Sequence, residues 1–346
     1  MKLRRTFFTF AFVALFMGIA FGVSEGQVGT PITPQGVQIH FANREMEAEL
    51  QIRTLLHNLR QDISIRRLTF QVGYTTALDF QIKQITGAIV PPNFAQLVPQ
   101  QNATALKILK ELQAPTPAPA CSPGTPTFDW RQANGVTSVK DQGACGSCWA
   151  FGTVGAFEGS WHFFNGQVIH ASEQDILDCN PWGYSCAGGW WAFQQLINPG
   201  VASEESYPYT NIEGPCRSVP RPYKAVAWAY VGTDHNIPSV AQLKQHLCTY
   251  GPLGVTVRVT PAFQAYTGGV FNEDSPGNIN HAVTLIGWDD AKQAWLIKNS
   301  WGTGWGDTCG YGSERGYMWI HYNSNSIGYA AAWVQAIQGS INLIGR

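Results

Sequence analysis

The chain opens with an apolar run that no later segment matches in length without a charge or a turn. Three basic residues among the first five precede residues 6–24, which are uncharged and rich in Phe. A basic start, an apolar middle and small residues such as Ala20 and Gly22 are typical of a secretory signal peptide. The alternative is a transmembrane anchor, because the run approaches the ~20 residues that span a bilayer. We expect cleavage, which makes residues 1–22 the signal peptide and leaves no membrane attachment afterwards.

Helical spacing of apolar residues begins after Asn43. Three acidic residues lie near the expected helix start: Glu45, Glu47 and Glu49. Apolar residues then recur at i, i+3, i+4, i+7 and i+11, namely Ile52, Leu55, Leu56, Leu59 and Ile63. This pattern predicts one amphipathic helix. The sequence of residues 70–73 is typical of a short strand. Pro91-Pro92 breaks the pattern of apolar residues after Ile89 and Val90.

Proline marks the main boundary of the chain. Five of the twelve residues 115–126 are proline, which predicts a stiff, exposed and extended linker that proteases cut easily. All 13 Trp and all 8 Cys lie after residue 120. We therefore expect two parts of different character, one on each side of this linker.

Charge is sparse and balanced along the chain. The 22 basic and 23 acidic residues give a net charge of −1, which supplies no field to hold a nucleic acid or an anionic membrane surface. Only 13% of the residues are charged and 45% are hydrophobic, so the chain has ample material for a core. A secreted protein also permits disulfides among its cysteines.

Cys148 stands where a glycine-containing turn passes into a segment that is apolar almost all round, which predicts a buried helix. Ser147 is in the N-cap position, so the thiol lies in the first turn, where free backbone N–H groups and the helix dipole favour a thiolate. Gly152, Gly155 and Gly159 suggest that another backbone segment approaches this helix closely. The position suits a nucleophile.

The run Gln142-Gly143-Ala144-Cys145-Gly146-Ser147-Cys148-Trp149 resembles the active-site segment of the papain family of cysteine proteases. The resemblance begins at Asp129-Trp130-Arg131 and continues at intervals to about residue 333, so it covers the whole second part. His281 and Asn299 follow Cys148 by 133 and 151 residues, at or just beyond the ~130–150 expected for this family.

The resemblance implies a catalytic role for each of these residues. His281 would take the proton of Cys148 to form a thiolate–imidazolium pair, and Asn299 would orient the imidazole. Gln142 and the Cys148 backbone N–H would stabilise the oxyanion, and Trp301 would keep water from the His281–Asn299 hydrogen bond. Each residue alone is more often structural, and their common order and flanks favour catalysis.

Aligned positions of the family also imply a substrate groove. Gly188 and Gly189 lack side chains where an extended peptide backbone would approach for strand-like hydrogen bonding. The residues that would form the main specificity pocket are Trp190, Thr256, Ile279, Ala282 and Ala332. None of them is charged, so we expect an apolar or aromatic side chain at the second residue before the scissile bond.

Disulfides follow from the same resemblance, which implies the pairs Cys145–Cys186 and Cys179–Cys216. The family's third bridge is missing, because Ser275 and Ile327 stand where its cysteines are expected. Cys121, Cys248 and Cys309 remain, and we expect Cys121–Cys248 to pair. Cys309 lies in an insertion, residues 308–315, where the family has almost nothing. A zinc site is the alternative for these cysteines, but without metal-ligand spacing we expect no metal and no cofactor.

The implied fold class is α+β, a papain-like two-lobed fold with a helical left lobe that carries Cys148 and a β-barrel right lobe that carries His281 and Asn299. A partly helical prosegment would precede it. The expected domains are the signal peptide at 1–22, the prosegment at 23–114, the proline-rich linker and activation region at 115–127 and the papain-like peptidase domain at 128–346.

The implied function is that of a secreted cysteine endopeptidase, made as a zymogen, that hydrolyses peptide bonds through a thioester acyl-enzyme. Its partners would be extended protein or peptide substrates and its own prosegment as an intramolecular inhibitor, and a monomer is expected. Extracellular, periplasmic and lysosome-like locations all remain open. The alternatives are a catalytically silent peptide-binding homologue and a Cys-His amidase or transacylase that acts on cell-wall peptides.

The prosegment departs from the family. Residues 26–113 do not reproduce the spaced Glu, Arg, Phe, Asn and Ile pattern of papain-like zymogens, so inhibition by this segment is a hypothesis that rests on its position. Asn102-Ala103-Thr104 is the one glycosylation sequon of the chain. It lies in this segment and does not change the functional interpretation.

Overall fold

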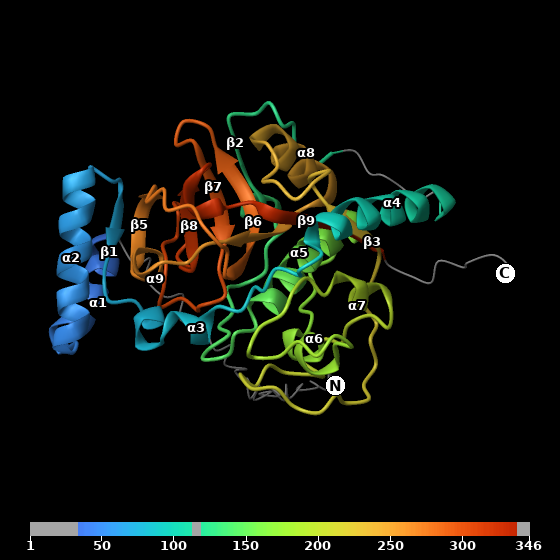
Figure 1. Cartoon of the computed structure of the whole chain (residues 1–346), viewed down its shortest axis with the longest axis horizontal. Helices are drawn as coiled ribbons and strands as arrows, with labels where there is room; N and C mark the ends of the chain where they lie inside the picture. Colours follow the sequence, from blue (N-terminus) through green and yellow to red (C-terminus); the bar gives the residue numbers. More distant parts are fainter. Residues whose placement is uncertain (1–33, 113–118, 338–346) are drawn as a thin grey trace, which may run out of the picture. The chain divides into compact units, whose positions relative to one another are not determined.

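The computed structural model describes residues 34–112 and 119–337 (Figure 1). The predicted signal peptide and residues 113–118, which include the start of the predicted linker, lie outside the described residues. No helix within the described ranges is long and apolar enough to cross a membrane.

Two helices occupy the region where one was predicted. They are α1 (Pro34–Glu47) and α2 (Leu50–Arg66), so the prediction of a single helix from Asn43 is wrong. Glu49 is the N-cap of α2, whereas Glu45 lies in the last turn of α1, where its carboxylate accepts two hydrogen bonds of 2.6 Å from Arg60 of α2. The apolar residues at helical spacing all lie in α2, where they pack against the larger buried apolar cluster of the chain.

The rest of the N-terminal part contains four short or amphipathic elements. They are β1 (Phe70–Val72), η1 (Thr76–Asp79), α3 (Ile82–Ile85) and α4 (Phe94–Leu112). The predicted strand is confirmed as β1, which pairs antiparallel with β5 of the second part. The N-terminal part therefore adds a strand to the sheet of the peptidase region.

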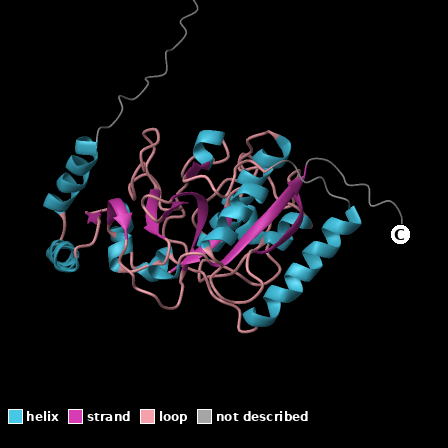
Figure 2. Ribbon diagram, turned by 90° about the horizontal axis from the view of Figure 1, so that it is seen from above, coloured by secondary structure: helices cyan, strands magenta, loops and turns pink. Residues whose placement is uncertain are grey.

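Within the described residues, nine strands form one sheet in the order β1-β5-β8-β7-β6-β4-β9-β3, with β2 paired to β6. The strands of the second part are β2 (Thr127–Asp129), β3 (Lys224–Tyr230), β4 (Leu253–Val257), β5 (Tyr266–Phe271), β6 (His281–Asp289), β7 (Ala294–Lys298), β8 (Tyr317–His321) and β9 (Tyr329–Ile337). All pairs are antiparallel except β5 with β8. Figure 2 shows the strands with helices on both sides.

Helices complete the second part: η2 (Trp130–Ala133), α5 (Cys148–Asn165), α6 (Glu173–Cys179), α7 (Phe193–Ile197), α8 (Val240–Tyr250), α9 (Pro261–Gln264) and η3 (Ser324–Ser326). One buried apolar cluster surrounds most of the sheet and a second surrounds α5. This is the expected α+β, two-lobed arrangement.

Glycines let α5 lie close to its neighbours, but the atoms that approach are mostly side chains and not the backbone that was predicted. A Cβ atom at Gly155 would lie 2.4 Å from Thr284 Oγ1 of β6, and one at Gly159 would lie 2.3 Å from Cγ of Pro252. Both distances are below any real Cβ contact, so a larger side chain would push the helix away. The helix that begins at Cys148 is thereby held against the strand that begins at His281.

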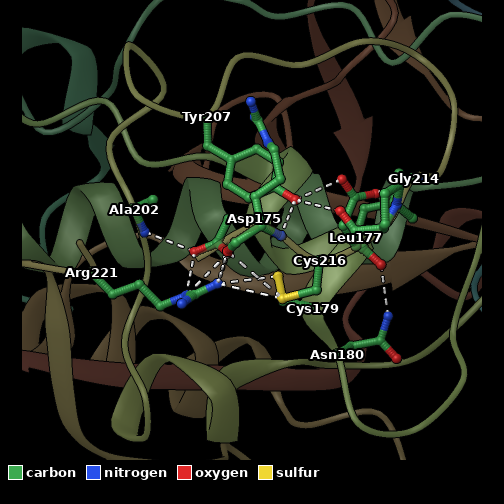
Figure 3. Close-up of a disulfide and its surroundings, with 12 residues drawn as sticks. Asp175, Leu177, Cys179, Asn180, Ala202, Tyr207, Gly214, Cys216 and Arg221 are labelled. Carbon is green, nitrogen blue, oxygen red and sulfur yellow. Dashed lines mark hydrogen bonds and ion pairs between the residues drawn. A yellow bond between two sulfur atoms is a disulfide. The ribbon is translucent and has the colours of Figure 1, made fainter. Parts of the chain in front are cut away.

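The structure forms the three disulfides that were expected: Cys121–Cys248, Cys145–Cys186 and Cys179–Cys216. Figure 3 shows the third, with Arg221 bound to Asp175 and Nη2 of Arg221 lying 3.1 Å from the Cys179 sulfur. Cys148 and Cys309 are free. Within residues 34–112 and 119–337, no three His, Cys, Asp or Glu side chains are grouped to hold a metal ion.

The 308–315 insertion packs beside η2 and the N-terminal part. Arg131 donates a hydrogen bond of 2.6 Å to the carbonyl of Thr308, and Tyr311 donates one of 3.2 Å to the carbonyl of Arg131. The Arg315 guanidinium lies 4.1 Å from the centre of the Phe41 ring of α1. The insertion therefore contacts the helix α1, which its sequence gave no means to predict.

Candidate active site

Cys148 is the first residue of α5, and its side chain is fully buried. Ser147 is the N-cap, as predicted, but its side chain makes no capping bond and lies 2.7 Å from the hydroxyl of Tyr209. Backbone groups of Ala282, Gly87, Trp149 and Ala88 surround the thiol. Two of these belong to the N-terminal part of the chain, and Ala282 directly follows His281.

His281 and Asn299 meet because β6 and β7 are adjacent antiparallel strands. His281 begins β6, Asn299 follows the end of β7, and His281 Nε2 lies 2.8 Å from Asn299 Oδ1. The same Oδ1 accepts a hydrogen bond of 2.8 Å from the backbone N–H of Ser300. Since this oxygen acts only as an acceptor, Nε2 carries the imidazole proton. The lone pair is then on Nδ1, which is buried without a hydrogen-bond partner.

Trp301 covers this hydrogen-bonded pair. Its ring centre lies 4.7 Å from that of His281, with 32° between the ring planes. Only 3% of the Trp301 side chain is exposed. An indole in this position keeps water from the hydrogen bond between His281 and Asn299, which strengthens it.

Gln142 precedes Cys148 in the chain and is fully buried. Its Oε1 accepts a hydrogen bond of 2.7 Å from the Ser300 hydroxyl, which fixes the direction of its amide. Its Nε2 donates to the carbonyl of Cys145 (2.7 Å) and to that of Ile85 (3.3 Å). Trp301 Nε1 donates to the same Ile85 carbonyl at 3.1 Å.

A segment of the N-terminal part lies along Gly189 in strand-like pairing. The Gly189 N–H donates to the carbonyl of Gly87 (2.8 Å), and the Ile89 N–H donates to the carbonyl of Gly189 (2.9 Å). Ala88 donates to the carbonyl of Asn280 at 3.0 Å. A Cβ atom at Gly87 would lie 1.9 Å from the carbonyl oxygen of Gly146. Only a residue without a side chain fits between this segment and the nucleophile loop.

Burial controls the protonation of the thiol and the imidazole. It raises the pKa of Cys148 to about 11, although surrounding backbone groups act in the opposite direction. It lowers the pKa of His281 to about 4, against the effect of Asn299. Both groups are therefore neutral at pH 7 in this structure. Burial therefore disfavours the thiolate–imidazolium pair that the resemblance implies, although the backbone groups of Gly87 and Ala88 act to lower the pKa of the thiol.

The predicted pocket residues lie in or beside one buried apolar cluster. Trp190, Ile279, Ala282 and Ala332 share one apolar cluster with Ala88. Thr256 of β4 is in register with Ala282 of β6. The Thr256 hydroxyl donates a hydrogen bond of 2.7 Å to the carbonyl of Tyr329. Gly188 has a φ of +131°, and a Cβ atom there would lie 2.5 Å from Ile89 Cδ1.

Tyr329, which lines the groove beside these residues, was not predicted from the sequence. A groove of about 610 Å³ is bounded by Ile279 and Tyr329 together with residues 88–90. Tyr329 begins β9. Its part in the groove follows from its pairing with Thr256, which no local pattern in the sequence reveals.

A buried charge cluster near the site was also missed. Lys140 Nζ lies 3.4 Å from Glu158, 2.9 Å from Glu173 and 2.7 Å from Glu204. Burial opposes the Lys140 charge, but the three carboxylates raise its pKa overall. Burial raises the pKa of Glu173 in spite of Lys140. The one hint in the sequence was Glu158, a charge inside an otherwise apolar helix.

Comparisons with known proteins agree with this geometry. The sequence profile described as papain family cysteine protease matches residues 125–337. A cathepsin L-like proteinase of Fasciola hepatica is 35% identical over 280 residues, which cover 78% of this chain and 79% of that protein. Digestive cysteine proteinase 2 of Homarus americanus is 33% identical over 288 residues, covering 77% of this chain and 85% of that protein.

Among solved structures, the digestive procathepsin L 3 of the Tenebrio molitor larval midgut matches with a TM-score of 0.62 and 26% identity. The match covers 89% of this chain and 94% of that one, so it includes the N-terminal part. The arrangement of Cys148, His281 and Asn299 thus lies in a region that matches one family throughout, and the chain belongs to the papain family of cysteine proteases as a papain-like cysteine peptidase.

Proposed function

We propose that the chain is a secreted cysteine endopeptidase made as a zymogen, in which residues 85–89 block the active site until the prosegment is removed. The observation that supports this most directly is that the carbonyl of Ile85 accepts hydrogen bonds from the side chains of both Gln142 and Trp301. A substrate oxyanion would need the same donor of Gln142. The three disulfides and the signal-like N-terminus fit an extracytoplasmic location.

The proposed reaction begins when His281 Nδ1 takes the proton of Cys148. The thiolate attacks the carbonyl carbon of the substrate, and the oxyanion accepts hydrogen bonds from Gln142 Nε2 and the Cys148 backbone N–H. His281 then gives the proton to the leaving amine, and a thioester remains. Water, deprotonated by His281, hydrolyses the thioester and releases the carboxyl product and the free thiol.

Asn299 keeps the imidazole in the tautomer that this reaction needs. Its Oδ1 holds Nε2–H, so the lone pair of Nδ1 stays available for the thiol. In the intact chain burial keeps the thiol neutral, and Gly87 and Ala88 are among the residues whose backbone groups surround it. Removal of these residues would hydrate the site and allow the thiolate–imidazolium pair to form.

The oxyanion assignment predicts the effect of Gln142→Ala in the activated enzyme. The kcat/KM for a peptide substrate should fall about 10²- to 10³-fold, mostly in kcat, because one oxyanion donor is lost. Gln245→Ala, an exposed change on α8, is the matched control and should retain full activity. Peptide hydrolysis that survives Cys148→Ser would refute the mechanism, and binding without turnover by the activated wild type would favour the peptide-binding alternative.

The uncharged pocket predicts substrate preference. Between two peptides that differ only at the second residue before the scissile bond, the one with Phe should be hydrolysed with at least about tenfold higher kcat/KM than the one with Arg. A guanidinium there would lose water without gaining a partner among Trp190, Ile279 and Ala332. Equal or reversed rates would show that these residues do not form the pocket.

Alkylation tests the protonation of the thiol. In the uncleaved chain with Cys309→Ser, which leaves Cys148 as the one free thiol, iodoacetamide should react slowly at pH 7. Because the pKa of Cys148 is raised to about 11, the rate should increase roughly tenfold per pH unit up to that pH. After prosegment removal the rate at pH 7 should rise at least about 100-fold. Identical rates before and after removal would contradict the proposed block.

Gly87 gives a direct test of the block itself. Gly87→Ala places a Cβ atom against the backbone of Gly146, so residues 85–89 should leave the groove and the uncleaved chain should hydrolyse peptide from the start. Gly124→Ala is the control, because a Cβ atom there meets only the Ser122 hydroxyl at 3.8 Å. Initial rates with the chain shown to be uncut on a gel provide the measurement. A Gly87→Ala chain as latent as the control would rule out this role.

A further inference from the structure

Tyr209 takes no part in the reaction described above, yet its hydroxyl contacts two segments of the active site. This hydroxyl donates a hydrogen bond of 3.0 Å to the backbone carbonyl of Gln142. The side-chain oxygen of Ser147 lies 2.7 Å from the same hydroxyl. Since a carbonyl only accepts, the Tyr209 proton points to Gln142, and Ser147 donates its own proton to Tyr209. The three residues therefore form one chain of hydrogen bonds that runs from Ser147 to Gln142.

The two ends of this chain are the residues that set the positions of the two oxyanion donors. One donor is the backbone N–H of Cys148, which belongs to the peptide bond that follows Ser147. The other donor is the side-chain amide of Gln142. Ser147 is fully buried, and its hydroxyl does not make the bond to the helix that an N-cap serine ordinarily makes. The Ser147 hydroxyl is bound to Tyr209 instead of to α5.

The loop that carries Tyr209 is held to α6 on both sides of this residue. Tyr207 (Figure 3) is 1% exposed, and its carbonyl accepts a hydrogen bond of 2.5 Å from the Ser172 hydroxyl. The Thr210 N–H donates a hydrogen bond of 2.8 Å to the side-chain oxygen of Gln174. Ser172 is the N-cap of α6 and Gln174 lies in its first turn. The position of Tyr209 is thereby fixed by a helix outside the active site.

The ring and the hydroxyl of Tyr209 have separate contacts. The ring centre lies 4.9 Å from that of Phe151 in α5, with 82° between the ring planes, so the ring packs edge-on against this helix. A Cβ atom at Gly143 would lie 2.3 Å from Asn211 Nδ2, so the same loop also contacts the segment that carries the oxyanion glutamine. Burial raises the pKa of Tyr209, which keeps its hydroxyl protonated as a donor at neutral pH.

We propose that Tyr209 is a positioning residue of the oxyanion hole, whose hydroxyl sets the distance between Gln142 Nε2 and the Cys148 N–H without touching the substrate. The proposal rests on the proposed function, which assigns these two donors. An oxyanion is stabilised best when both donors are already aimed at it before the reaction begins. The hydrogen-bond chain reaches both donors through neighbouring groups, so loss of the Tyr209 hydroxyl would displace the donors without removing either.

The experiment uses variants made as the full chain and activated by cleavage. Tyr209→Phe keeps the ring against Phe151 and removes the hydroxyl. For a peptide amide, kcat should fall about tenfold while KM stays within about twofold, a smaller loss than in Gln142→Ala because no donor is removed. A peptide aldehyde should bind about tenfold more weakly, because the Cys148 thiol adds to its carbonyl and the hemithioacetal oxygen lies in the same hole. Iodoacetamide alkylates Cys148 by displacing iodide and forms no oxyanion, so the alkylation rate should stay within about twofold.

Three further variants separate positioning from a general loss of structure. Tyr223→Phe is the matched control, because it also removes a hydroxyl from a ring that packs edge-on against α5, 5.2 Å from Trp161 at 74°, and it should match the wild type. Ser147→Ala removes the other end of the chain and should lower kcat about threefold, which serves if Tyr209→Phe does not fold. Gln142→Ala combined with Tyr209→Phe should lose no more than about twofold beyond Gln142→Ala, because the spacing of two donors no longer matters once one is gone.

Three outcomes would overturn the proposal. They are an unchanged kcat in both Tyr209→Phe and Ser147→Ala, an equal loss of kcat, aldehyde affinity and alkylation rate in Tyr209→Phe, and losses that multiply in the double variant. If the activated wild type hydrolyses no peptide, the proposed function fails. Aldehyde binding needs no turnover, so in that case it alone decides whether Tyr209 positions the hole.

Discussion

Exclusion of water from the Cys148 thiol and the His281 imidazole is the constraint on which the other properties of the site depend. Both side chains are fully buried, and burial is the largest influence on each pKa. Backbone groups of Gly87 and Ala88, from the N-terminal part of the chain, are among those that surround the thiol, so its protonation is linked to occupancy of the groove. A thiol in the first turn of a helix would otherwise have a lowered pKa, and burial outweighs that effect here.

Close packing brings the catalytic groups of the two lobes together. α5 carries Cys148, β6 carries His281, and glycines of α5 remove the side chains that would separate them. The buried cluster of Lys140 with Glu158 and Glu173 lies in the same region, where Lys140 also binds the carbonyl of Ala171. Breaking such a cluster by removing one partner leaves a buried charge uncompensated. The position of α5 thus depends on small residues where it meets β6 and on paired charges where it meets α6.

The sequence predicted the parts of the site that are encoded locally and missed those that depend on distant partners. The flanks of Cys148, His281 and Asn299 sufficed to bring these three residues into one hypothesis, and the structure places His281 beside Asn299. The break between α1 and α2 was missed because the start of α2 is set by the backbone conformation at Glu49, which the apolar spacing inside α2 does not reveal. α4 was missed although its apolar residues recur at helical spacing, because Pro91-Pro92 precede it and Pro99 lies inside it, and proline is unfavourable within a helix.

The disulfide between Cys121 and Cys248 determines which cuts in the linker can free the N-terminal part of the chain. This disulfide attaches Cys121 to α8, and the Ala120 N–H donates a hydrogen bond of 3.0 Å to the carbonyl of Cys248. On the other side of the linker, α4 ends at Leu112. A cut before Cys121 separates prosegment from peptidase and leaves both flanking structures in place. A cut after Cys121 would leave the prosegment attached to α8 through the disulfide, so cleavage alone would not release it. Under the proposed function, release of the whole prosegment therefore requires a cut before Cys121, followed by dissociation of the contacts that α4 makes with β3.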